Sequence, residues 1–576
     1  MRVVCKCLAS RYGLSIAILV IEMSLLLPNL RAQESGLSVA DELKGRIARH
    51  SRILADQFNE TRADLRGLQH VDRAYFASRS IRMGAQFDRS VAEDFASIAT
   101  EAISASIKDS ETLSQIEVFR LSSAIDDLMH FDSRLGIRVV ANLLKTVEDR
   151  QATLGDGGGT LSDLLATIAL KTTDRDTALT ENLIFASLKR SLSDLLPSAV
   201  AMLYRRDPDR GSRVIGRVIE QTRFNFSDSS ARMLFNIDRH AFEFSEGKPF
   251  SLRDQKVILN TFVSNMIDAA AMEDLRPARC GMAFYAVSMR ERVSKLIPER
   301  RLAFDQSVDL CTPYIGPRSR NIAFASDGID EVATANDIFE KAKNENDKDR
   351  KLGLYRLGLS RLREKDEYAR MISLLDGFEG DDFRSVSEPG WRSWRITAAY
   401  HVVIKAIREG DLSAAYNYLD KTPANLRPLV RNRLLTNSDV GLPEQFRGDC
   451  LHQLENELTR SYISPSEAAD IYLDLIDLYF PVSRADSLGA FEKTIRSINK
   501  ADKEPHENFS GFSWSDDVAF PDVKSDLLSH DEIAVSQALK DLSTSISRIR
   551  MRLGLLSPSL REYVKLRASA NIVRRD

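Results

Sequence analysis

A pair of short amphipathic helices joined by a Gly-Asp turn is the feature that most constrains this chain. Between residues 399 and 407, apolar side chains recur every three or four positions, which places them on one face of a helix. Gly410 can end that helix in a left-handed conformation, and Asp411 can cap the next helix. The apolar face of that next helix consists of Leu412, Ala415, Tyr416 and Leu419. Because two helices of this size cannot bury their apolar faces alone, the unit predicts helical neighbours.

Similar units occur before and after this one. A shift of 45 residues aligns 408–411 with 363–366, which places Lys365 opposite Gly410. A third pair of helices is predicted over residues 468–498, broken at Pro481. A helical hairpin that recurs every roughly 34 to 47 residues is typical of an α-solenoid. The predicted fold is therefore all-α, with stacked antiparallel helical hairpins in one body or in two halves.

The segment Gly410–Ala415, which reads GDLSAA, resembles a tetratricopeptide-type repeat. That family has a small residue inside the first helix, where this chain has Val403 or Gly358, so the repeat is degenerate. The resemblance covers residues 351–500 and implies a solenoid. More loosely, the whole layout looks like a group of uncharacterised exported bacterial helical-repeat proteins, a likeness that implies no activity.

The first 32 residues have the pattern of an export signal. Three basic residues lie within the first 11, residues 14–27 are apolar apart from Glu22, and Ala32 precedes the predicted cleavage site. A carboxylate in the middle of a bilayer costs about 3 kcal/mol, so Glu22 favours a cleaved signal over an uncleaved anchor, which stays the alternative. We therefore expect an exported protein, periplasmic or extracellular, with no integral membrane segment after cleavage of Met1–Ala32.

Composition supports a helical chain with an ordinary surface charge. Only 17 prolines and 27 glycines occur in 576 residues, and alternating strand patterns are nearly absent. The 80 basic and 83 acidic side chains give a formal charge of −3, which does not indicate nucleic acid as a partner. At this length one compact core is not expected, so we predict several helical regions.

Composition shifts along the chain mark the boundaries of these regions. The glycines at 155–159 mark one break. Residues 503–523 have few helix formers and are predicted to be a long loop. The predicted segments are a signal peptide (1–32), an N-terminal helical region (33–154), a second helical region (160–317), a charged connector (318–350), tetratricopeptide-like hairpins (351–500), an aromatic loop (501–529) and C-terminal capping helices (530–576).

Two of these regions carry more detailed expectations. Residues 224–250 are aromatic and irregular, which is typical of a domain junction, with a ligand groove as the alternative. The capping region is expected to form a helix or a pair of helices over 530–553 and a separate helix over 560–573.

Three cysteines remain after the predicted signal, namely Cys280, Cys311 and Cys450. An odd number cannot pair completely within one chain. A disulfide between Cys280 and Cys311 is one interpretation, and three buried free thiols are the other. No CxxC sequence occurs, so the spacing for a redox or zinc-thiolate site is missing.

Catalytic and metal-binding motifs are not recognisable. Neither HExxH nor GxSxG occurs. Asp126 and Asp127 lie near His130 in a helical pattern, which suits either a divalent cation or the solvated face of an amphipathic helix. Asp381 and Asp382 are predicted loop acids. We predict no catalytic, cofactor or metal site and no cofactor.

The favoured function is an exported, non-catalytic helical-repeat scaffold that binds a protein or peptide on a curved face. The alternative is an exported helical enzyme acting on glycans or lipid-like substrates through carboxylates such as Asp126, Asp127, Asp381 or Asp382. A third reading is a structural component of an envelope assembly. A deep pocket with converging acids would favour the enzyme, and a shallow groove lined by tyrosine and leucine would favour the binder.

Overall fold

The computed structural model shows helices as the only regular elements among the residues that it describes, which confirms the all-α class. The described residues are 39–109, 113–150, 159–225, 227–242, 250–314, 333–346, 348–377, 388–437, 441–460, 463–503 and 521–573. The predicted signal peptide lies outside them, as do the glycines at 155–158 and the aromatic residues 504–520. Among the described helices, none is both long enough and apolar enough to cross a bilayer.

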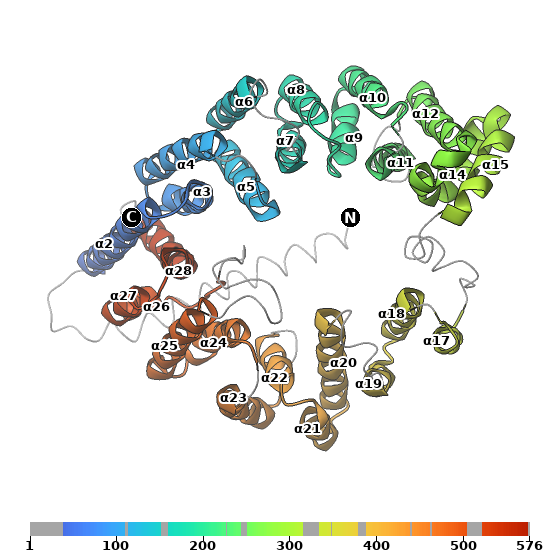
Figure 1. Cartoon of the computed structure of the whole chain (residues 1–576). Helices are drawn as coiled ribbons and strands as arrows, with labels where there is room; N and C mark the ends of the chain where they lie inside the picture. Colours follow the sequence, from blue (N-terminus) through green and yellow to red (C-terminus); the bar gives the residue numbers. More distant parts are fainter. Residues whose placement is uncertain are drawn as a thin grey trace, which may run out of the picture.

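The helices follow one another around a ring-shaped body made of two arcs (Figure 1). The first arc contains α2 (Val39–Arg66), α3 (His70–Phe87), α4 (Arg89–Asp109), α5 (Gln115–Phe131), α6 (Ser133–Arg150), α7 (Gly159–Thr172), α8 (Thr177–Leu188), α9 (Leu196–Arg206), α10 (Pro208–Thr222), α11 (Asp228–Phe242), α12 (Leu252–Ala271), α13 (Arg276–Arg279), α14 (Ala283–Leu296) and α15 (Arg301–Cys311). Short 3₁₀ turns are η2 (Glu273–Leu275), η3 (Cys280–Met282), η4 (Pro298–Arg300) and η5 (Thr312–Tyr314).

The second arc returns along the other side of the ring. It contains α17 (Ala335–Lys343), α18 (Lys348–Glu364), α19 (Tyr368–Gly377), α20 (Glu388–Arg408), α21 (Leu412–Lys421), α22 (Arg427–Thr436), α23 (Glu444–Arg460), α24 (Pro465–Tyr479), α25 (Arg484–Ala501), α26 (Leu527–His530), α27 (Glu532–Lys540) and α28 (Ser545–Val573). The predicted pair of helices around Pro481 corresponds to α24 and α25.

Local sequence explains where many of these helices begin. Three of them start with a capping box, in which a hydroxyl and a carboxylate satisfy free N–H groups reciprocally. The residues of these boxes are Ser114 and Glu117, Thr334 and Asp337, and Ser464 and Glu467. Asp207 ends α9 and caps α10 at once, because its side chain accepts from the Arg210 N–H.

Each helix packs against its chain neighbour and often against the helix after that. In the first arc α5, α7 and α9 pack in series along the inner side, and α8, α10 and α12 pack in series along the outer side (Figure 1). In the second arc α20 contacts both helices beside it, α19 and α21, and also α22. The hairpin units near Gly410 and Asp366 therefore touch their chain neighbours, as stacking requires. Their assignment to tetratricopeptide repeats stays a prediction.

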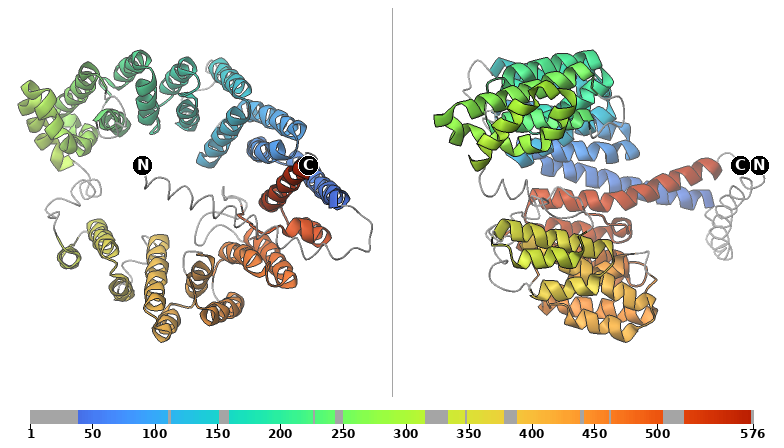
Figure 2. Two further views of the ribbon diagram at one scale, coloured as in Figure 1. Left: turned by 180° about the vertical axis from the view of Figure 1, so that it is seen from behind. Right: turned by 90° about the vertical axis from the view of Figure 1, so that its right-hand side faces the viewer.

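The two arcs meet where the first described helix packs against the last. The long helices α2 and α28 lie side by side at this point, as the views in Figure 2 show. One apolar core runs from the first arc through this contact into the second arc as far as Ala399. A smaller separate core, which includes Phe339, Leu359 and Met371, lies under α17, α18 and α19.

A disulfide joins Cys280 to Cys311 and ties η3 to the end of α15. The two Cα atoms are 5.0 Å apart, which is within the usual range for a disulfide. Cys450 is a buried free thiol. The interpretation with three free thiols is therefore wrong.

Several helices lie where the sequence suggested irregular structure. The helix α11 occupies much of the aromatic region 224–250. Within the aromatic region, Phe250 stacks on Tyr204 at 4.2 Å between ring centroids. The short helix α26 lies at the end of the predicted aromatic loop.

The C-terminal region forms one long helix where a break between 553 and 560 was expected. Pro558 lies inside α28, although proline removes one helical hydrogen bond. The surrounding side chains are fully buried and hold the helix by packing. These side chains are Leu553, Leu555, Leu556 and Leu560.

Candidate functional site

Two hairpin turns with the same backbone geometry border the candidate site. Asp366 has φ 56° and Gly410 has φ 79°, so both lie in the left-handed region. In each turn the next N–H donates to a carbonyl in the last helical turn, from Glu367 to Leu362 O and from Asp411 to Ala406 O, both at 2.9 Å. The structural equivalent of Gly410 is therefore Asp366.

The predicted alignment of Lys365 with Gly410 is therefore wrong by one residue. That alignment matched charged side chains, whereas the turn is fixed by the residue with positive φ. Asp411 caps α21 as predicted, since its Oδ1 accepts from the Ala414 N–H at 2.8 Å. Glu367 occupies the corresponding position before α19, and its carboxylate accepts from Arg370 Nη1 at 3.0 Å.

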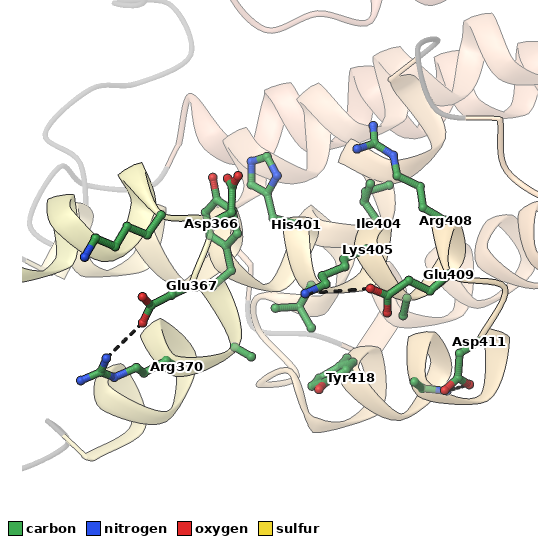
Figure 3. A pocket seen from close by; sticks show the side chains of 16 residues that line it. Asp366, Glu367, Arg370, His401, Ile404, Lys405, Arg408, Glu409, Asp411 and Tyr418 are labelled. Atoms are coloured by element: carbon green, nitrogen blue, oxygen red, sulfur yellow. Dashed lines mark hydrogen bonds and ion pairs between the residues drawn. The ribbon is translucent and has the colours of Figure 1, made fainter. Parts of the chain in front are cut away.

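A groove of about 1010 Å³ lies between these turns and the helices that they connect (Figure 3). Its apolar lining comes mainly from α20, where Val402, Ile404 and Ala406 are almost fully buried. The other lining residues are Lys365, Asp366, Glu367, Tyr368, Ala369, Arg370, His401, Lys405, Arg408, Glu409, Asp411, Ala414 and Tyr418. Hence the groove combines an apolar base with a charged rim.

A stacked pair of rings, Tyr368 and His401, forms one wall of the groove. Their centroids are 4.3 Å apart and their planes are inclined by 9°. Burial lowers the pKa of His401, and nearby arginines, Arg433 first among them, lower it further. Burial also raises the pKa of Tyr368. At neutral pH this wall is therefore aromatic, polar and uncharged.

The charged rim contains two exposed ion pairs. Arg370 Nη1 lies 3.0 Å from Glu367 Oε2, and Lys405 Nζ lies 3.9 Å from Glu409 Oε1. Each pair joins residues three or four positions apart on the surface. Pairs of this kind contribute little to stability, about 0.3–0.5 kcal/mol, so a ligand can replace one partner at little cost.

Asp126 and Asp127, which the enzyme alternative names as catalytic carboxylates, each pair with a different neighbouring helix. Asp126 pairs with Lys171 of α7 at 2.9 Å. Asp127 accepts from Arg79 of α3 at 3.1 Å and from Ser78 at 3.0 Å. Burial raises the pKa of Asp127, and Arg79 opposes this shift. The two carboxylates thus tie α5 to two different helices.

The other candidate metal ligands and catalytic acids do not come together as a site in the part of the chain that the structure describes. His130 lies 3.3 Å from Asp126, but its ring is exposed on the surface of α5. Among the described residues, no group of three or more histidine, cysteine or acidic side chains is placed to hold a metal ion. Asp381 and Asp382 lie outside the described residues.

A second cleft of about 480 Å³ between α22 and α24 contains two more carboxylates. Asp474 accepts from Asn432 Nδ2 at 2.6 Å, and burial raises the pKa of its carboxyl. Asp477 accepts from the backbone N–H groups of Lys524 and Ser525, the latter at 2.8 Å. Both carboxylates therefore already serve to hold neighbouring segments.

The groove as a whole was not predicted, although its two turns were. The signal in the sequence was the recurrence of a turn between amphipathic helices. The sequence did not show the space between the two turns, because that space depends on how α19 packs against α20. The Tyr368–His401 stack joins positions 33 residues apart and has no periodic signature.

Comparisons of the chain with protein-family models, with curated proteins and with solved structures found no match.

Proposed function

We propose that this protein is an exported, non-catalytic scaffold that binds an extended protein or peptide segment in the groove between α18–α19 and α20–α21. The single observation that carries the proposal is the groove itself, with a volume of about 1010 Å³, a buried apolar base and a charged rim. A space of this kind accepts apolar side chains at the base and main-chain or charged groups at the rim.

The wall of the groove supports a peptide ligand rather than a small charged substrate. Tyr368 and His401 present a flat, uncharged surface, on which side chains and peptide planes can pack. The rim pairs are exposed, so a peptide can exchange partners with Arg370 or Lys405 without uncovering a buried charge. This arrangement suits a partner that is recognised by shape and by several weak contacts.

Two features support export. Residues 1–32 have the pattern of a signal peptide, and the disulfide between Cys280 and Cys311 is of the kind found in oxidising compartments. The engagement of Asp126 and Asp127 in separate interhelical contacts favours the scaffold over the enzyme alternative.

The proposal is tested by capturing partners from an envelope extract of the source organism with the mature chain, residues 33–576, and identifying them by mass spectrometry. The groove variant K405E/R408E reverses two exposed rim charges. The control variant R217E/K343E reverses two exposed charges that belong to comparable ion pairs on α10 and α17. We expect one set of partners to be bound by the wild type and the control and lost with the groove variant. Equal capture by all three proteins would contradict the proposal.

A further inference from the structure

The contact between α2 and α28, here called the terminal junction, joins residues almost 500 positions apart. It comprises Gln57, Glu60 and Asp64 with Arg548 and Arg552, together with a second cluster of His50, Asp526 and Ser559. The helix α2 packs more extensively on α28 than on its chain neighbour α3. The first helix of one arc is thus held mainly by the last helix of the other.

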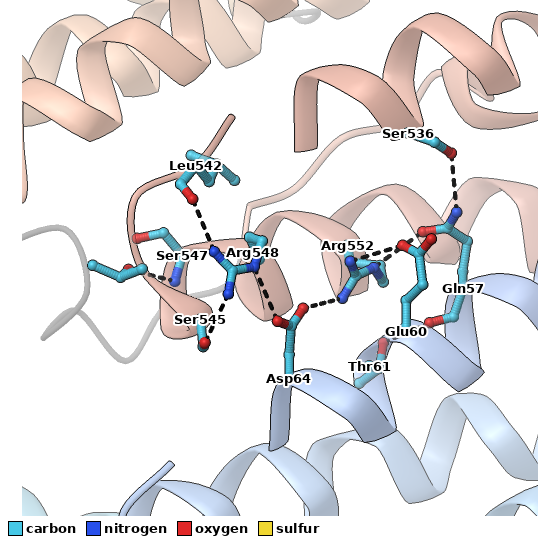
Figure 4. Close-up of polar contacts among 11 residues, drawn as sticks. Gln57, Glu60, Thr61, Asp64, Ser536, Leu542, Ser545, Ser547, Arg548 and Arg552 are labelled. Carbon is cyan, nitrogen blue, oxygen red and sulfur yellow. Dashed lines mark hydrogen bonds and ion pairs between the residues drawn. The ribbon is translucent and has the colours of Figure 1, made fainter. Parts of the chain in front are cut away.

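The first cluster fixes the register of the two helices (Figure 4). Arg552 is only 2% exposed, and its three nitrogens donate to Gln57 at 3.1 Å, Asp64 at 2.8 Å and Glu60 at 3.0 Å. Arg548 donates to the other oxygen of Asp64 at 2.9 Å. A guanidinium buried in this way needs all of its carboxylate partners, so the two helices fit in one relative position.

The second cluster contains a buried histidine. His50 is 9% exposed; its Nδ1 faces the Arg46 carbonyl of the same helix at 3.1 Å, and its Nε2 lies 3.6 Å from Asp526 Oδ2. Asp526 belongs to the turn before α26 and also accepts hydrogen bonds from Ser559 of α28 and from the Ser529 N–H. One carboxylate therefore connects three helices, and its charge is balanced only when His50 carries a proton.

The other charged groups around His50 either favour its protonated form or are bound to other residues. Glu562 of α28 faces the histidine and binds Arg46 at 3.3 Å. Arg49 donates to the Ser529 carbonyl at 3.1 Å. The Asp526 carboxylate raises the pKa of His50, burial opposes this, and the net shift is upward from 6.5.

We propose that the terminal junction is a proton-controlled latch, which is closed when His50 is charged and opens between α2 and α28 when His50 loses its proton. The direction of this pH dependence follows from the thermodynamic linkage between protonation of His50 and closure of the junction. The pKa of His50 is higher in the closed state, so its contribution to closure is complete below about pH 6.5 and is lost as the pH rises through the closed-state pKa. The arginine cluster, whose contacts fit only one relative position of the two helices, restores the same register on closing.

The latch is tested on the full mature chain with spin labels at K44C and K565C, two exposed positions beside the junction, in a C450A background. Distance distributions are measured by double electron–electron resonance at pH 5.5 and pH 8.0. For the wild-type junction we expect a short distance at pH 5.5 and, at pH 8.0, an additional longer-distance population that increases by roughly twofold or more.

Three variants make this test specific. We expect H50Q to show the longer-distance population at both pH values and H50K, whose charge persists, to show mainly the short distance at both. The control H452Q changes an exposed histidine of α23 and should retain the wild-type response. Circular dichroism verifies that each variant keeps its helices. A distance distribution that is the same at both pH values in the wild type, or a response that persists in H50Q, would overturn the proposal.

Discussion

At the scale of single residues, the turns beside the groove place two different amino acids in one left-handed conformation. Gly410 adopts φ 79° without a side chain, whereas Asp366 adopts φ 56° with its Cβ close to the following carbonyl. The sequence placed the turn to within one residue, because helical stripes on both sides bound it. It did not identify Asp366 as the left-handed residue, since aspartate is common in both the cap and the left-handed position.

We expect D366G to raise the free energy of unfolding by about 0.5–1 kcal/mol, because the gain from relieved backbone strain exceeds the loss from a more flexible unfolded chain. The reverse change, G410A, should lower it by a similar amount, although no atom lies within 4 Å of the added Cβ. Urea unfolding followed by circular dichroism measures both effects, with D366N as a nearly neutral control. If D366G is instead less stable than the wild type, the Asp366 side chain stabilises the fold by more than its left-handed backbone conformation destabilises it.

The wall residue His401 gives a pH dependence with a definite sign. Its pKa is lowered, chiefly by burial, so folding favours the neutral imidazole. Stability contributed by His401 is therefore present above the unfolded pKa of about 6.5 and is lost as the pH falls through the lower folded pKa. We expect the amides of α20 to lose protection against hydrogen exchange between pH 7.5 and pH 5.5, and H401Q to remove this loss. The control is H452Q, which replaces an exposed histidine.

At the scale of helices, hydrophobic periodicity located most elements and the tertiary environment decided the rest. The stripes around Gly410 and Pro481 corresponded to real helices. By contrast, α11 was not predicted, although its buried residues Ala231, Leu234, Ile237 and Ala241 recur at helical spacing. The helix α28 continues through Pro558 because packing outweighs one lost hydrogen bond.

Close packing between α17 and α18 depends on a glycine inside a helix. A Cβ added at Gly358 would lie 2.5 Å from the Phe339 ring, whereas Gly353 of the same helix has open space. We expect G358A to lower the free energy of unfolding of this region by about 1–3 kcal/mol through overpacking. G353A should raise it by up to about 1 kcal/mol, since alanine favours helix. Hydrogen exchange in α17–α19 measures both, and equal effects of the two changes would contradict this packing.

The disulfide joins two elements that lie 31 residues apart in the sequence. The double variant C280S/C311S should lose about 2–4 kcal/mol of stability, because the cross-link restricts the unfolded chain. The change C450S should leave this linkage intact, as Cys450 is a free thiol. Peptide mapping without reductant, combined with thermal unfolding, tests both statements. Recovery of Cys280 and Cys311 as free thiols would contradict the linkage.

At the scale of the whole molecule, the arrangement of the arcs depends on contacts that leave no mark in local sequence. Gln57 and Ser536, which bond at 3.2 Å, are 479 residues apart. Periodicity shows which face of α2 is apolar, but it cannot show that α28 covers that face. For the same reason, the sequence predicted stacked hairpins and a curved body, while the closure of the ring and the position of the groove required coordinates.

The central claim is that an extended partner occupies the groove between the two hairpin turns. Hydrogen–deuterium exchange of residues 33–576, alone and saturated with a captured partner, tests it most directly. We expect new protection in residues 365–370 and 401–418, which line the groove, and little change in α8 and α10 on the first arc. Protection that leaves both groove segments unchanged and appears on other helices would contradict the claim.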